Sequence, residues 1–148
     1  MEQTVTVKFK MMEGCADLAP TKAHHDDAAY DLRAREAAVL EPHKVALVPT
    51  GLFLELPTHY EAQIRPRSGM ALKHALTIPN SPGTIDAGYR GEVAVIMLNA
   101  GGEPYAVKRG ERVAQMVINR LPVVELVQAD ALSESRRGEG GFGSTGKH

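Results

Sequence analysis

Short apolar segments separated by closely spaced turns limit the fold of this chain more than any other feature. Between residues 37 and 64, alternating apolar side chains occur in short groups, and Pro42, Pro49-Thr50-Gly51 and Pro57-Thr58 separate those groups. Alternation with a period of two predicts strands with one buried face. Strands this short, with turns this frequent, are typical of an antiparallel sandwich or barrel. We therefore predict an all-β fold, with a turn at residues 49–51.

The same pattern continues on both sides of this region. It predicts strands over residues 28–34, 105–107, 112–118 and 123–127, and an N-terminal strand in which Val5, Val7 and Phe9 share one face. Only residues 68–75 favour a helix, which Gly69 limits to one or two turns. The alternation stops near Ala129, and the last eleven residues include five glycines. We predict a β-barrel domain over residues 1–128 and a flexible arm over 129–148.

Composition narrows the class of partner. The 148 residues are 43% hydrophobic and 24% charged, which suits one soluble domain with a core. The net charge of −1 argues against a general nucleic-acid or membrane surface. Cys15 is the single cysteine, no apolar run is long enough to span a membrane, and the start lacks the apolar block of a secretion signal. We expect a cytoplasmic protein whose partners are small molecules.

The stretch GTIDAGYRGE, residues 83–92, carries the strongest sign of a binding site. Three glycines frame an acid, Asp86, and an aromatic, Tyr89, three positions later. Glycine tolerates tight turns and lets a ligand approach the main chain, so the stretch predicts a β-hairpin. The following strand is apolar on both faces, which places Asp86 beside a buried sheet. Asp86 taken alone is equally consistent with a turn-capping residue.

Other polar motifs are weaker signals. Arg65-Pro66-Arg67-Ser68-Gly69 lies at a predicted strand-to-helix junction, where guanidinium groups and backbone amides could bind an anion. The loop from His24 to Asp27 resembles a metal-ligand set, but no second ligand cluster accompanies it, so a solvated loop is the better interpretation. The segment 141–147 imitates a phosphate-binding loop, yet no strand precedes it and no helix can follow it. Phe142, isolated among glycines, has nothing local to pack against and suits stacking on a base.

Five segments in this order closely resemble the motifs of the trimeric deoxyuridine triphosphatases (dUTP diphosphatases, dUTPases). They are AAYDL, RPRSGM, NSPGTIDAGYRGE, GERVAQM and RRGEGGFGSTG, and they cover nearly the whole chain. The resemblance implies a jelly-roll-like β-barrel of the dUTPase β-clip type. It also implies a homotrimer with active sites at the subunit interfaces, where a swapped glycine-rich arm closes over a site built by other subunits. The implied reaction converts dUTP to dUMP and pyrophosphate.

The resemblance also implies a role for individual residues. Asp86 would activate the water that attacks the α-phosphorus, and Tyr89 would pack under the deoxyribose and exclude a 2′-hydroxyl. The residues implied to bind uracil are Asn80, Gly83, Thr84, Ile85 and Ala94. Those implied to hold the phosphates are Arg67, Ser68, Gly69 and Gln115. The arm would add Arg137, Phe142, Gly143, Ser144 and Thr145. Mg²⁺ would be held by the triphosphate and waters, with no direct protein ligand and with Asp31 nearby.

Two rival functions stay open at the level of sequence. The dCTP deaminases share the fold and a similar hairpin, but they use a Glu ten residues after the Asp, where this chain has Ile96. A non-catalytic regulatory protein on the same scaffold would bind nucleotide or a protein partner as a switch. The intact set of Asp86, Arg67 and Arg137 favours the triphosphatase over both.

Overall fold

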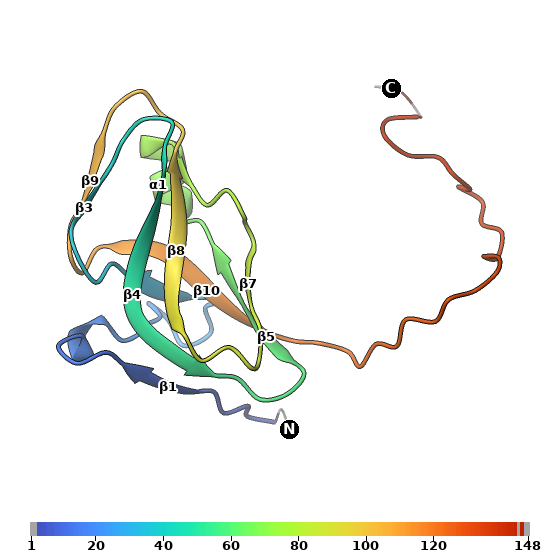
Figure 1. Cartoon of the computed structure of the whole chain (residues 1–148), viewed down its shortest axis with the longest axis horizontal. Coiled ribbons are helices and arrows are strands. Elements are labelled where there is room, and N and C mark those ends of the chain that lie inside the picture. The colour runs from blue at the N-terminus through green and yellow to red at the C-terminus, as the bar shows by residue number, and fades with distance from the viewer. Residues whose placement is uncertain (1–2, 145, 147–148) are drawn as a thin grey trace.

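Two four-stranded antiparallel sheets and a two-stranded sheet contain all the strands of the computed structural model, which describes residues 3–144 and 146 (Figure 1). The first sheet has the order β1 (Lys8–Met11), β4 (Val45–Glu55), β8 (Glu92–Asn99) and β6 (Leu76–Thr77). The second has the order β2 (Tyr30–Arg33), β10 (Arg112–Arg120), β5 (Tyr60–Arg65) and β7 (Gly83–Ile85). The small sheet pairs β3 (Ala38–Leu40) with β9 (Tyr105–Val107). The predicted all-β class is confirmed.

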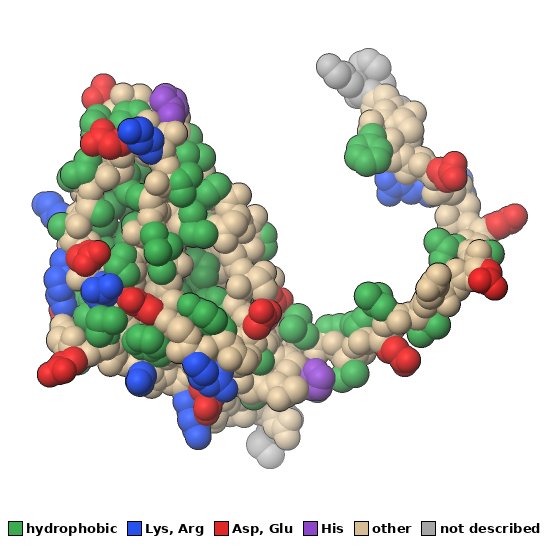
Figure 2. All heavy atoms as spheres, in the orientation of Figure 1, with side chains coloured by type: hydrophobic (Ala, Val, Ile, Leu, Met, Phe, Trp, Pro, Cys, Tyr) green, Lys and Arg blue, Asp and Glu red, His purple; other side chains and the backbone are tan. Residues whose placement is uncertain are grey.

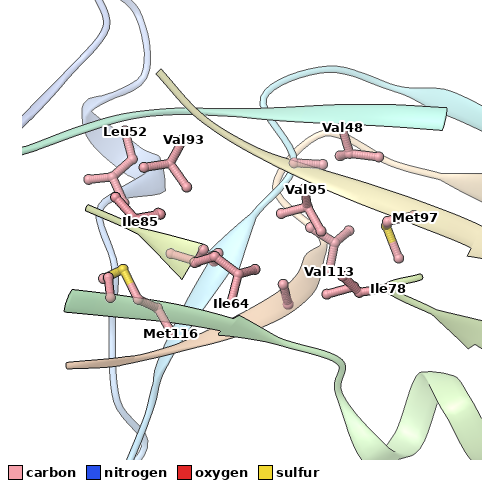
Figure 3. Close-up of a cluster of buried hydrophobic side chains, with 14 of the residues drawn as sticks. Val48, Leu52, Ile64, Ile78, Ile85, Val93, Val95, Met97, Val113 and Met116 are labelled. Atoms are coloured by element: carbon pink, nitrogen blue, oxygen red, sulfur yellow. The ribbon is translucent and has the colours of Figure 1, made fainter. Parts of the chain in front are cut away.

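The core lies between the inner faces of the two large sheets (Figure 3). Val48 and Leu52 of β4, with alternate residues of β8, face Ile64 of β5 and Met116 of β10 across this space. Along β8 the buried residues alternate with half-buried ones, so the strand whose sequence is apolar on both faces is fully buried on only one. The buried residues of β8 are Val93, Val95, Met97 and Asn99. The two half-buried positions next to the cleft described below are Ala94 and Ile96.

One strand replaces the turn predicted at residues 49–51. β4 continues from Val45 to Glu55, and its register against β8 shifts between Pro49 and Leu52, which marks a β-bulge. Gly51 has a φ of 72°, a conformation that glycine adopts without strain. The Thr50 hydroxyl donates a hydrogen bond to the Val93 carbonyl and so fastens the bulge to β8. Proline and glycine therefore mark an irregular point inside a strand and not its end.

Both ends of the domain differ from prediction. β1 begins at Lys8, so Val5 lies outside it, and Phe9 is 54% exposed and does not join the core. The prediction of a strand at residues 123–127 is wrong for the single chain. The last strand ends at Arg120, and residues 121–139 are all exposed. This apolar alternation has no partner strand among the described residues of the chain. The short helix is confirmed as α1 (Ser68–His74), and one 3₁₀ turn, η1, covers Ala16–Leu18.

The C-terminal arm leaves the domain after β10 and extends away from it (Figure 1). Its hydrophobic side chains are spaced along the segment without protein around them (Figure 2). Among them, Leu126 is 95% exposed and Leu132 is 91% exposed. Apolar side chains in water contribute nothing to the stability of one chain, so these residues do not anchor the arm to its own domain.

Replacement of Leu52 by alanine is expected to lower the free energy of unfolding by about 2–5 kcal/mol, because it removes a side chain from a closely packed core and leaves a cavity. Leu52 is 1% exposed, whereas Leu72 on α1 is 87% exposed and provides a matched control. Leu72→Ala should change stability by less than about 0.5 kcal/mol. Urea denaturation at one protein concentration measures the free energy of unfolding of both variants. Equal losses in Leu52→Ala and Leu72→Ala would contradict the assigned core.

Candidate active site

A cleft of about 670 Å³ lies beside the turn that connects β7 to β8. It gathers seven of the site residues expected from sequence, which come from the segment before β7, from β7, from the turn and from β8. They are Asn80, Gly83, Thr84, Ile85, Asp86, Tyr89 and Ala94. The floor of the cleft is apolar, with Ile64, Ile78 and Val95 among the lining residues. Such a cleft combines an apolar floor with main-chain polar groups and one carboxylate, which suits a flat heterocycle attached to a polar group.

The connection itself is not the predicted hairpin. β7 pairs with β5 in the second sheet, whereas β8 pairs with β4 and β6 in the first, so the turn crosses between sheets. Within it, the Tyr89 amide donates to the Asp86 carbonyl at 3.1 Å, and the Tyr89 hydroxyl donates to the Glu92 carbonyl at 2.9 Å. The Tyr89 ring lies over Gly91, where a Cβ would overlap the hydroxyl. Glycine at position 91 therefore makes room for the ring.

Asp86 is exposed and does not lie buried beside the sheet as the sequence suggested. Between residues 3 and 144, no side-chain hydrogen bond or ion pair to its carboxylate is found. Arg90, the cationic residue of the same turn, has other partners: it donates to the Ala87 carbonyl at 2.7 Å and pairs with Glu55 at 3.7 Å. The carboxylate is thus available as a hydrogen-bond acceptor at the edge of the cleft.

A second cleft, of about 540 Å³, is lined by three of the residues predicted to hold the phosphates. Arg67, Ser68 and Gln115 line it, and the Gln115 amide donates to the Pro66 carbonyl at 3.0 Å. Gly69 is the second residue of α1, and a Cβ there would meet nothing within 4 Å. The two clefts share no lining residue. Along β5, Gln63 and Arg65 line the second cleft and Ile64 the first, so the clefts open on opposite faces of this strand.

Asp31 joins two arginines next to the second cleft. Its carboxylate lies 3.6 Å from Arg67 Nε and 3.5 Å from Arg112 Nη1. Arg67 also donates to the Arg112 carbonyl at 3.2 Å. The Asp31 side chain is only 20% exposed, so the two guanidinium groups are held together by a largely buried acid. This arrangement concentrates positive charge where an anion could bind.

The arm extends away from the sheets (Figure 1), and none of its described residues lines either cleft in the single chain. Arg137 donates through Nε to the Gly140 carbonyl at 2.6 Å, and Phe142 is fully exposed. Gly143 and Ser144 follow in a turn, and Thr145 lies outside the described residues. The structure thus places the expected site residues in three separate groups.

Three ionisable residues of the first cleft were not found by sequence reasoning: Arg35, Glu36 and Glu92. Arg35 Nε donates to Glu92 Oε2 at 3.0 Å, and this contact raises the pKa of the Arg35 guanidinium above its ordinary value. Glu36 lies 3.6 Å from Arg35 Nη1. Glu92 ends the glycine-framed motif and was visible in the sequence, whereas nothing local in the sequence distinguishes Arg35.

Among residues 3–144 and 146, no group of three or more His, Cys, Asp or Glu side chains is placed so that it could bind a metal ion. In the loop from His24 to Asp27, the His24 amide donates to Asp27 Oδ2 at 2.9 Å, which is an ordinary turn contact.

In the described part of the chain, no helix has the length and apolar character needed to cross a membrane.

Comparisons with known proteins identify the family of this chain. A family model described as dUTPase matches residues 18–146. The deoxyuridine 5'-triphosphate nucleotidohydrolase of Solibacter usitatus is 57% identical, over 88% of this chain and 89% of that protein. The corresponding protein of Clostridium tetani is 51% identical, over 96% and 97%.

Solved structures show the same fold. A mutant of the Staphylococcus bacteriophage 80alpha dUTPase with dUpNHpp aligns with a TM-score of 0.87 and 32% identity, over 97% of this chain and 99% of that chain. A mutant dUTPase from phage phi11 of S. aureus, whose structure reveals coordination of a structural Mg(II) ion, aligns with a TM-score of 0.78 and 28% identity, over 85% and 97%. The predicted jelly-roll-like fold is thus confirmed, and the chain belongs to the dUTPase family.

Proposed function

We propose that this protein hydrolyses dUTP to dUMP and pyrophosphate, supplying dUMP for thymidylate synthesis and keeping uracil out of DNA. The observation that carries the proposal is Asp86, an exposed carboxylate without a partner among the described residues, at the edge of a cleft lined by the main chain of β7. Membership of the dUTPase family supports the substrate class. The steps below follow from the side chains that line the clefts.

Uracil would enter the first cleft and bond to main-chain groups of Gly83–Ile85 and Ala94, with Asn80 beside them. β7 pairs through only one of its edges within the sheet, with β5, so main-chain groups on its other edge are available to a ligand. Because main-chain donors and acceptors alternate along a strand, they can match the imide edge of uracil as a base would. The apolar residues Ile64 and Ile78 would cover the ring.

Asp86 would orient and deprotonate the water that attacks the α-phosphorus. Hydrolysis at phosphorus requires little covalent assistance, but the nucleophile must be aligned and the negative charge on the phosphate oxygens must be balanced. Tyr89 would pack under the sugar and leave no space for a 2′-hydroxyl. The same carboxylate would accept a hydrogen bond from the 3′-hydroxyl and so fix the distance between sugar and nucleophile.

Arg67, Ser68, Gly69 and Gln115 would bind the phosphates, and Arg137 would add a second guanidinium group. Mg²⁺ fits this site as an ion held by phosphate oxygens and waters, because the acid that contacts Arg67, Asp31, is already paired with Arg67 and Arg112, and no cluster of metal ligands is found among the described residues. Bound there, the ion would supply charge to the phosphate oxygens. The chain's own residues hold the phosphates, orient the water and remove its proton.

A homotrimer would bring the separated groups together. The two clefts open on opposite faces of β5, and the arm extends away from the domain, so the three groups lie apart in the single chain. The outer face of β4 exposes Val45 and Leu47, which are 58% and 65% exposed, as an interface would require. In this arrangement the arm is swapped and carries Phe142, Gly143 and Ser144 to the uracil and phosphates of another subunit.

The direct test offers dUTP, dCTP, dTTP and UTP separately with Mg²⁺ and identifies the products. Formation of dUMP and pyrophosphate from dUTP alone supports the proposal. Release of ammonia from dCTP would instead indicate a deaminase, although Ile96 lines the cleft where that reaction needs a proton carrier. Absence of any turnover, with dUTP still bound, would indicate the regulatory alternative.

Discrimination against dTTP provides a quantitative prediction. A 5-methyl group pushed against the walls of the first cleft should cost about 1–3 kcal/mol through overpacking. We therefore expect kcat/KM for dTTP to be about 10–200-fold below the value for dUTP. Pyrophosphate release at equal nucleotide concentrations measures the ratio, and comparable values would contradict the proposed uracil pocket.

A further inference from the structure

Glu92 lies at the start of β8, where its side chain contacts two parts of the chain that are distant in sequence. Its carboxylate accepts a hydrogen bond from Arg35 Nε at 3.0 Å and a second, longer one from Arg35 Nη2 at 3.5 Å. The same carboxylate accepts the Gly51 amide at 2.9 Å. The side chains of Glu92 and Arg35 are 21% and 28% exposed, so the pair is partly shielded from solvent.

The anchor for this carboxylate is the bulge of β4. Gly51 is the residue of that bulge with a positive φ, the Cys15 side chain closes its Cβ position, and its carbonyl accepts the Met12 amide at 2.7 Å. The Arg35 amide donates to the Pro49 carbonyl at 2.8 Å, so Arg35 is fixed to the same bulge through its main chain. Thr50 fastens the bulge to the residue after Glu92, at the Val93 carbonyl. The Glu92 side chain therefore binds a rigid support.

The main chain of Glu92 contacts the turn between β7 and β8. Its carbonyl accepts the Tyr89 hydroxyl at 2.9 Å, and the Tyr89 ring covers Gly91 between them. The Tyr89 amide in turn donates to the Asp86 carbonyl at 3.1 Å. The Glu92 main chain is thus linked to the Tyr89 ring through its hydroxyl and, through the Tyr89 main chain, to residue 86.

We propose that Glu92 is a positioning residue, which, anchored by Arg35 and the Gly51 amide, sets the place of the Tyr89 ring and so the preference for deoxyribose over ribose. This inference rests on the proposed function, because Tyr89 is assigned there to the sugar. Charge-assisted and bidentate hydrogen bonds are stronger and more directional than neutral ones, which suits this pair to holding a turn in one place. Neither Glu92 nor Arg35 needs to touch the nucleotide for this role.

Glu92→Gln tests the proposal, because it keeps the size of the side chain and removes its charge. We expect the ratio of kcat/KM for dUTP to that for UTP to fall at least tenfold, while the melting temperature stays within a few degrees. Glu36→Gln is the matched control: it removes a carboxylate that also contacts Arg35 in the same cleft but is not bonded to the turn. The control should change the ratio less than twofold.

A second pair of variants separates positioning from a change in cleft charge. Arg35→Gln alone should lower the ratio as Glu92→Gln does, because it leaves the carboxylate with the Gly51 amide only. The double variant Arg35→Gln with Glu92→Gln can form a neutral amide pair at this position and should recover at least part of the ratio. Equal losses in Glu36→Gln and Glu92→Gln would overturn the proposal, as would an unchanged ratio in Glu92→Gln.

Failure of the positioning role can be told apart from failure of the proposed function. A wild-type protein without dUTP hydrolysis would refute the function, and a crystal structure of Glu92→Gln then decides the positioning role by itself. Displacement of the Tyr89 hydroxyl from the carbonyl of residue 92 supports that role. An unmoved Tyr89 in that structure overturns it, whatever the activity.

Discussion

Replacing Asp86 with asparagine is expected to lower kcat for dUTP by about 10²–10⁴-fold, the usual contribution of a general base. The amide has nearly the size of the carboxylate but cannot accept the proton of the attacking water. Asp86 is exposed and has no partner among the described residues, so the fold loses no contact in the variant. Affinity for a non-hydrolysable dUTP analogue should therefore remain within a few-fold of wild type.

Rapid-quench measurement of dUMP formation and calorimetric titration of the analogue test the two halves of this prediction separately. Asp26→Asn is the matched control, because Asp26 is also exposed but lies in the loop from His24 to Asp27, outside both clefts. It should leave kcat unchanged, and a fall there would revive a metal role for that loop. Turnover by Asp86→Asn close to wild type would mean that another group activates the water.

The sequence predicted the strands better than their ends. Alternation located β5, β8 and β10 because burial against one core imposes a period of two. It failed at residues 49–51, since proline and glycine are compatible with a turn and with a bulge, and the choice depends on the pairing of β4 with β8. It also failed at residues 123–127, where the apolar pattern is present but no described strand of the same chain pairs with it.

For the site, local motifs identified residues whose chemistry is unusual for their surroundings. Asp86 and Tyr89 between glycines, and Arg67 before α1, were visible because they lie in short segments with turn chemistry. Arg35 was not visible, because its importance comes from Glu92, which is distant in sequence and reaches it only when β4 and β8 pair. The separation of the two clefts was also beyond the sequence, since it depends on which face of β5 each residue occupies.

Deletion of residues 136–148 is expected to leave a folded protein that hydrolyses dUTP at least tenfold more slowly. The described residues of the arm make no contact with the core, so its removal should leave the melting temperature nearly unchanged. The loss arises because Arg137 and Phe142 no longer reach the phosphates and the base, and stacking of an aromatic on a base alone contributes about 1–3 kcal/mol. Full activity in the truncated protein would refute a closing arm.

Mixing these two weakly active variants decides whose site the arm closes. The truncated chain keeps Asp86 but lacks an arm, and full-length Asp86→Asn keeps the arm but lacks the base. If each arm serves another subunit, mixed trimers formed by co-expression contain sites with an intact Asp86 from one chain and an arm from its neighbour. Pyrophosphate release by the co-expressed pair should then exceed the sum of the two separate preparations severalfold. If each arm instead folds back on its own chain, no site in the mixture has both parts, and the activity will equal that sum.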